Sequence, residues 1–278
     1  MYCYFSIDKG CSAPLNRQEW TMPLPRLVKE FQAPGCFTLQ EAESLMGATK
    51  AREHVRYLLK QGYIETVRRS LYALVPELAG ALPDRYVLAS KARQGSYLSH
   101  HTALELLGVA QATFAGALYI TVPTRVAPFA FRGAMVRPVV SSRPIRDTGL
   151  VVKIKRGGQD LRVSGRELTL VQCLDRPRYA GGLGEVLDSV EGFSGLDWDR
   201  LEALIGPPDG PYPKASLNAK VGFVVERNSS RWHPPEGFLA GLEERTGKGV
   251  HYLGTSRGRG GRWVPRWRVI VPGSVLEA

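Results

Sequence analysis

The strongest constraint on the fold is the order of hydrophobic patterns between residues 24 and 75. Apolar residues recur at helical spacing from position 24 to position 31, and Pro34–Gly35 interrupts that pattern. The next segment, FTLQEAESLMG, starts with Thr38 as its expected N-cap and has Glu41 three residues later, which is the spacing of a capping box. Gly47 is expected to end this second helix, because glycine readily adopts the positive φ found after a helix.

A third amphipathic segment is expected to run from Thr49, its N-cap, to about Gln61, with Gly62 as the stop. Its apolar residues fall on one side at about 100° per residue. Two short runs, YIETV and LYALV, follow it and are rich in β-branched and aromatic residues, which is typical of a hairpin. Three helices and a hairpin in this order indicate a winged helix-turn-helix over residues 23–76.

A proline-containing linker between Pro76 and Pro83 is expected to separate this unit from a second domain over residues 84–272. Helical and strand patterns are mixed in that domain. The expected fold class is therefore α+β, with an N-terminal winged helix-turn-helix followed by a larger mixed α/β domain. This linker should let each domain bury its own core.

Within the second domain, Ser99 is the expected N-cap of a helix that Gly108 ends. The paired glycines Gly157–Gly158 predict a hairpin turn, because primed turns require positive φ. A glycine-rich loop, SRGRGGRW, lies between two expected strands and is interpreted as a nucleic-acid contact or a mobile hairpin tip. The alternating aromatics of RWVPRWRV are expected to lie in the core. The remaining elements are helices at 86–95, 167–193, 198–205, 216–227 and 235–247, and strands at 116–124, 133–141, 249–255 and 266–272.

The charge of the chain favours a polyanionic partner. The formal net charge is +11 and the pI is about 9.7, and residues 45–76 alone hold six basic against two acidic side chains. The four cysteines form no CxxC pair, which favours reduced thiols over a zinc site. Residues 1–22 have no sustained period and are expected to form an arm; they lack a signal-peptide pattern. No apolar run approaches the about 20 residues of a membrane helix, so a cytoplasmic protein without a membrane partner is expected.

The basic side chains gather on the outer side of the third helix and in the hairpin turn. The N-terminal half of such a helix reads base edges, and a lysine there can donate to guanine while a glutamate accepts from cytosine. Basic residues further along the helix, and the two arginines of the turn, suit phosphates or a narrow minor groove. The alternative is that these side chains are only solvated. We favour double-stranded DNA, because both basic surfaces belong to one motif, and expect contacts from Thr49, Lys50, Arg52, Glu53, Arg56, Lys60, Arg68 and Arg69.

Two other groups of residues could suggest chemistry. His100–His101 could bind a metal, but Ser99 before them and the periodic run after them favour the start of a helix. Asp160 and Glu167, with lysines on the preceding strand at 153 and 155, could form a metal-dependent nuclease cluster, but the charged outer face of a hairpin explains them more simply. We therefore expect no catalytic residues, no metal and no cofactor.

The ordered set of segments resembles the AbiEi family. These segments are FTLQEAESLMGATKAREHVRYLLKQGYIETVRRSLYALV, YVLASKARQGSYLSHHTALELLGV, ALYITVPTR, LTLVQCLDRPRYAGGLGEV and PRWRVIVP, and the resemblance covers residues 23–272. The family comprises antitoxins and transcriptional repressors of type IV toxin–antitoxin systems. The resemblance implies a winged helix that binds inverted repeats in its own promoter, and a C-terminal domain that counters a cognate nucleotidyltransferase-type toxin.

The hairpin carries the family's Arg-Arg-x-Leu-Tyr pattern at positions 68, 69, 71 and 72, although Ser70 stands where the family often has glycine. A serine there implies a different turn geometry. Two alternatives remain open at the level of sequence. The protein could be a solitary winged-helix transcriptional regulator, or a metal-dependent nuclease with a winged-helix targeting domain.

Overall fold

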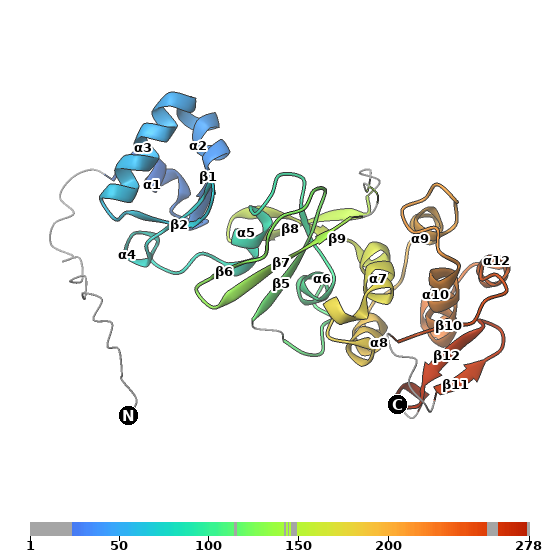
Figure 1. The fold of residues 1–278 in the computed structure, drawn as a ribbon. Coiled ribbons are helices and arrows are strands. Elements are labelled where there is room, and N and C mark those ends of the chain that lie inside the picture. The colour runs from blue at the N-terminus through green and yellow to red at the C-terminus, as the bar shows by residue number, and fades with distance from the viewer. Residues whose placement is uncertain are drawn as a thin grey trace, which may run out of the picture.

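The computed structural model describes residues 24–113, 116–141, 143, 145, 149–254 and 261–276, and the expected N-terminal arm at 1–22 lies outside them. The chain forms three successive parts along one long axis, with the N-terminal unit at one end, a sheet in the middle and a mostly helical part at the other end (Figure 1). No helix within these residues is both long and apolar enough to cross a membrane. The expected fold class, a winged helix followed by a larger mixed α/β domain, is confirmed.

The N-terminal unit contains three helices and a three-stranded antiparallel sheet of order β1-β3-β2. Strand β1, which the sequence patterns did not predict, pairs with β3 and closes the sheet on the side away from β2. The elements are α1 (Arg26–Phe31), β1 (Cys36–Thr38), α2 (Leu39–Met46), α3 (Ala48–Lys60), β2 (Ile64–Arg68) and β3 (Leu71–Leu74).

The capping box that begins α2 is present. The backbone N–H of Glu41 donates to Thr38 Oγ1 over 3.2 Å, and the backbone N–H of Thr38 donates to Glu41 Oε2 over 2.7 Å. The predicted N-cap of α3 is wrong, since Thr49 lies inside the first turn and Gly47 is the N-cap. The cause is the φ of +84° at Gly47, which ends α2 and starts α3 at the same residue.

The middle part is a six-stranded mixed sheet of order β6-β7-β5-β4-β9-β8. The turn of the β8–β9 hairpin has φ of +54° at Gly157 and +72° at Gly158, which confirms the predicted paired-glycine turn. The predicted N-cap Ser99 is wrong, because His100, with φ of +53°, is the N-cap of α6. Helix α4 (Pro76–Ala79) belongs to the N-terminal core, where Leu78 is buried. The elements of the middle part are α5 (Arg85–Ser90), β4 (Tyr97–Leu98), α6 (His101–Leu106), β5 (Ala117–Val122), β6 (Phe129–Phe131), β7 (Ala134–Val140), β8 (Val151–Arg156) and β9 (Gln159–Ser164).

The C-terminal part packs helices against a small sheet of order β10-β12-β11. Trp267 is fully buried, and its ring lies where a Cβ on Gly222 would come within 2.1 Å of it. Trp263 is 43% exposed, so only part of the aromatic run belongs to the core. The elements are α7 (Arg166–Asp175), η2 (Pro177–Tyr179), α8 (Leu183–Glu191), α9 (Trp198–Ile205), α10 (Ala215–Arg227), α11 (Ser229–Trp232), α12 (Phe238–Arg245), β10 (His251–Tyr252), β11 (Gly261–Val264), β12 (Val269–Pro272) and α13 (Gly273–Leu276).

The predicted glycine-rich loop falls mostly outside the described residues. Residues 256–260 are among those that are not described, whereas Gly261 and Arg262 begin strand β11. The two interpretations of that loop therefore stay predictions.

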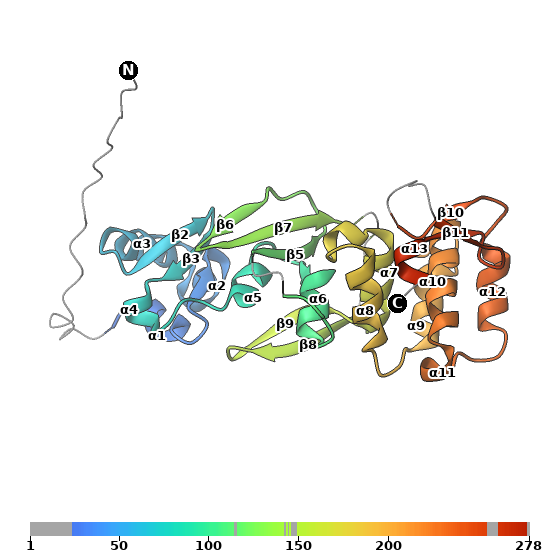
Figure 2. The ribbon, with the colours of Figure 1, turned by 90° about the horizontal axis from the view of Figure 1, so that it is seen from below.

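The cores of the N-terminal unit and the middle sheet are joined. One cluster of buried residues lies within the N-terminal unit, around Leu27, Phe37 and Leu58. A second cluster combines Cys36 and Leu71 of that unit with residues of α5 and the middle sheet. Strands β2 and β6 also lie beside each other (Figure 2). The winged helix is therefore packed onto the middle sheet, and the expectation that each domain buries only its own core is wrong, because the second cluster contains residues of both. The predicted boundary at 76–84 stays a prediction.

Candidate nucleic-acid interface

The solvent side of α3 carries most of the residues predicted to contact DNA. Its opposite side is buried, with Ala51, Val55 and Leu58 at most 3% exposed in the core of the N-terminal unit. This division follows from helical periodicity, since apolar residues at i, i+4 and i+7 face one way. The predicted residues on the exposed side are Thr49, Lys50, Arg52, Glu53, Arg56 and Lys60.

The basic side chains of α3 differ in their partners. Arg52 forms an ion pair with Glu43 of α2 over 3.1 Å. Lys50, Arg56 and Lys60 form no ion pair with any residue that the structure describes. Their charges are solvated and uncompensated, which is the state that favours counterion release when a phosphate is bound.

Tyr57 adds an aromatic ring to the same exposed side. It is 46% exposed and packs edge-on against Tyr63, with ring centroids 6.4 Å apart. An amphipathic ring of this kind can lie along a sugar-phosphate chain while its hydroxyl donates to a phosphate. The sequence patterns did not single it out as a contact, because tyrosine carries no charge.

The two arginines of the β2–β3 turn have different environments. Arg69 is exposed, whereas Arg68 is partly buried against the middle sheet. The Nη1 of Arg68 donates to the Ala92 carbonyl over 3.2 Å, and the guanidinium lies 5.1 Å from the centroid of the Phe129 ring. Burial lowers the pKa of Arg68, and the nearby charge of Arg93 lowers it further. Arg69 is thus the freer of the two to bind a phosphate.

Ser70 completes this turn in a left-handed conformation with φ of +63°. Its carbonyl accepts a hydrogen bond from the backbone N–H of Leu39 over 2.9 Å, which joins the turn to the start of α2. A serine therefore takes the conformation that a glycine adopts more readily.

Two ion pairs join the winged helix to the middle sheet. Lys91, which follows α5, donates to Glu41 Oε1 while Glu41 Oε2 closes the capping box of α2. Arg132 donates to Glu65 of β2 through Nη2 over 2.6 Å and Nε over 2.8 Å. Together with the contacts of Arg68, these pairs fix how the winged helix sits on the rest of the chain.

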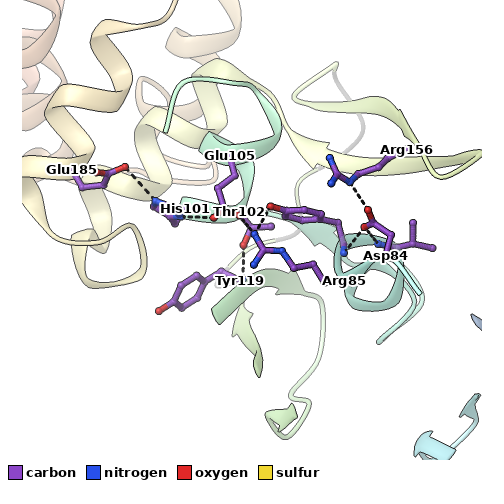
Figure 3. A network of polar contacts seen from close by, with 10 residues as sticks. Asp84, Arg85, His101, Thr102, Glu105, Tyr119, Arg156 and Glu185 are labelled. Carbon is purple, nitrogen blue, oxygen red and sulfur yellow. Dashed lines mark hydrogen bonds and ion pairs between the residues drawn. The ribbon is translucent and has the colours of Figure 1, made fainter. Parts of the chain in front are cut away.

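The His100–His101 pair is buried within the fold. His101 is fully buried, and its Nε2 lies 3.2 Å from Glu185 Oε1 in a polar network that joins α5, α6 and α8 (Figure 3). The same Glu185 oxygen accepts the backbone N–H groups of Gln111 over 3.0 Å and Ala112 over 3.2 Å. Burial lowers the pKa of His100 to about 3, with a smaller contribution from Arg176.

Asp160 and Glu167, which the sequence suggested as a nuclease cluster, lie in different environments. Glu167 is 3% exposed, and its Oε1 accepts the backbone N–H of Asp197 over 2.8 Å. Asp160 is exposed and lies opposite Lys155 in the β8–β9 pair. The described residues contain no group of three or more histidine, cysteine, aspartate or glutamate side chains that could hold a metal ion.

The arrangement of helices, sheet and short wing defines a winged-helix unit joined to a larger α/β domain. Residues 25–75 match the family model described as "Transcriptional regulator, AbiEi antitoxin", which confirms the resemblance over that segment. The chain is also similar to the RV2827C protein from Mycobacterium tuberculosis, whose crystal structure superposes with a TM-score of 0.59. The two chains are 19% identical, and the similarity covers 88% of this chain and 90% of the other, so it shows a shared fold. No curated protein matches the chain.

Proposed function

We propose that this protein is a DNA-binding antitoxin and autorepressor of a type IV toxin–antitoxin operon. The observation that carries the proposal is the exposed, uncompensated basic face of α3, in the segment that matches a regulator and antitoxin family. Double-stranded operator DNA with inverted repeats is the proposed target, and the protein acts in the cytoplasm, where that DNA lies.

Binding rests on α3 and the wing. Lys50 and Glu53 near the N-terminus of α3 are exposed and suited to base edges in the major groove. Arg56 and Lys60, one and two turns further along, suit phosphates. Arg69 supplies the phosphate contact of the wing, because Arg68 is held by Ala92 and Phe129. Repression then follows from occupancy of the operator, with no bond made or broken.

Neutralisation of a nucleotidyltransferase-type toxin is assigned to the domain over 84–272. Its support is the match of the N-terminal segment to an antitoxin family, together with the size of the second domain, since a winged helix alone would suffice for repression. The solitary-regulator alternative is decided by the neighbouring gene. If no toxin gene adjoins this one, and expression of the adjoining genes harms no cells, the antitoxin role is wrong.

The repressor role is tested with DNA from upstream of the protein's own gene. We expect the full-length protein to bind this duplex at least about 1000-fold more tightly than a scrambled duplex at the same salt concentration. Equal affinity for both duplexes would contradict sequence-specific repression. Cleavage of the duplex on addition of a divalent metal ion would instead support the nuclease alternative.

The antitoxin role is tested by co-expression with the product of the adjoining gene. We expect full-length protein to restore growth to cells that express the toxin. A variant in which Lys50 and Arg56 are replaced by alanine should lose operator binding and still restore growth, because toxin neutralisation is assigned to the larger domain. Loss of both activities in this folded variant would assign neutralisation to the DNA-binding face.

A further inference from the structure

A basic cleft lies where the winged helix meets the middle sheet. A cavity of about 520 Å³ is lined by the start of α2, the wing and the segment after α5. A second cavity of about 250 Å³ shares part of this lining and continues to Asp160 and Arg162 on β9. The basic side chains of this cleft are Arg68, Arg69, Lys91, Arg93 and Arg162.

The acidic side chains in the basic cleft do not cancel this charge. Glu41 is occupied by Lys91 and by the capping box of α2. Asp160 forms no ion pair among the described residues, and with Glu41 it sets two acidic against five basic side chains, which leaves the cleft a net charge of +3. Arg69, Arg93 and Arg162, by contrast, form no ion pair with any part of the chain that the structure describes.

The cleft is also preorganised. Arg68 is held in place by the Ala92 carbonyl at 3.2 Å and by the Phe129 ring, on the same wall as Arg93. Placing Arg68 near Arg93 brings together two like charges, an arrangement that an anion between them would stabilise. The ion pairs Lys91–Glu41 and Arg132–Glu65 fix the spacing of the two walls.

We propose that the basic cleft binds the sugar-phosphate backbone of the same DNA duplex that α3 reads, on the segment that flanks the operator half-site. This inference rests on the proposed operator binding. Its basis is continuity: Arg69 belongs both to the wing and to the wall of the cleft. Two surfaces of the protein therefore bind one duplex. Helix α3 reads the bases, and Arg93 and Arg162 of the basic cleft extend phosphate binding onto the middle sheet.

The test compares two operator duplexes, one limited to the half-sites and one extended on both sides. Each phosphate contact steepens the dependence of log affinity on log salt by about 0.9, or about 3.5-fold in affinity between about 50 and 200 mM salt. We expect the wild-type slope to be steeper by about two units on the extended duplex. The variant R93A/R162A should lose this difference and bind the short duplex as the wild type does.

Two further variants sharpen the test. R93K/R162K keeps both charges and should retain most of the extra slope. R178A/R268A removes two exposed arginines of the C-terminal part and should leave both slopes unchanged. Arg93, Arg178 and Arg268 are exposed and Arg162 is partly buried, so thermal unfolding checks that each variant is folded.

The outcomes separate this inference from the proposed function. If the wild type binds neither duplex with sequence preference, the operator-binding proposal fails. If it binds the short operator specifically but shows equal slopes on both duplexes, only the cleft inference is overturned. It is also overturned if R93A/R162A loses affinity for single-stranded RNA of matched length while keeping the extra slope on DNA, because the cleft would then serve a different polyanion.

Discussion

Cys36 offers a chemical probe of how the winged helix is packed. It lies on β1, is fully buried, and packs with Leu71 and Ala73 in the same cluster as Val87 of α5. Burial raises the pKa of its thiol from 9.0 to about 12, against a smaller lowering by Lys91. Only a thiolate attacks a disulfide reagent, so packing of the winged helix should make Cys36 slow to react.

The size of this effect follows from the pKa. At about pH 8, a rise from 9.0 to about 12 reduces the thiolate fraction about 1000-fold. A more basic thiolate is intrinsically more nucleophilic, which restores about 20-fold. We therefore expect Cys36 to react at least about 50-fold more slowly than a free thiol, before any steric shielding.

The variant K91M/R132M removes both ion pairs described between the winged helix and the middle sheet. Partly exposed pairs contribute about 0.5–1 kcal/mol each, so losing two should raise the population in which the winged helix has separated from the middle sheet about 5- to 30-fold. The reaction of Cys36 should accelerate by that factor, as followed by mass spectrometry of its peptide. The control K214M/R266M removes ion pairs of the C-terminal part and should leave the rate unchanged. A wild-type Cys36 that reacts like a free thiol, or equal rates in both double variants, would refute the packing described here.

Three further predictions concern stability, each measured by urea unfolding. Thr38→Ala removes the N-cap of α2 and should lower the free energy of unfolding by about 1 kcal/mol, whereas an unchanged value would mean that the cap is dispensable. Ser70→Gly relieves a left-handed serine at the expense of a more flexible unfolded chain, so it should stabilise by up to about 1 kcal/mol, and a loss would show that the serine side chain is needed. The pKa of His100 is lowered to about 3 from 6.5, so between these pH values the unfolded state binds a proton that the folded state does not. Stability should therefore fall by about 1.4 kcal/mol for each unit by which the pH decreases from 6.5 toward 3. His100→Asn should lack this component of the pH dependence.

Local sequence patterns predicted the features that depend on near neighbours. The capping box needs only Thr38 and the residue three positions later, and the β8–β9 turn needs only Gly157–Gly158. The exposed side of α3 follows from one helical period. These features are decided within a few residues, so the sequence shows them directly.

Contacts between distant residues were beyond such patterns. Strand β1 has three residues, too few for a periodic signal, and it exists because it pairs with β3 some 35 residues later. Lys91 forms an ion pair with Glu41, 50 positions earlier in the chain, and Arg68 donates a hydrogen bond to the carbonyl of Ala92, 24 positions later. The basic cleft is built from such pairs, which is why Arg93 and Arg162 carried no signal in the sequence.

The predicted start of α3 was wrong for a related reason. Thr49 has the chemistry of an N-cap, but Gly47 already has a φ of +84° and both ends one helix and begins the next. Residue preference alone cannot choose between two capping residues that are two positions apart. The start of α3 is set by Gly47, the single residue that connects it to α2.

Base reading by α3 is tested by a thermodynamic cycle between Lys50 and individual operator base pairs. Affinities of wild type and Lys50→Ala are measured on the operator and on each single-base-pair variant of one half-site, at one salt concentration. If α3 reads bases, Lys50→Ala should weaken operator binding by about 1–3 kcal/mol and abolish discrimination at one base pair only. A loss that is equal on every duplex would contradict this expectation, because Lys50 would then contact the phosphate backbone and α3 would not read the sequence through this residue.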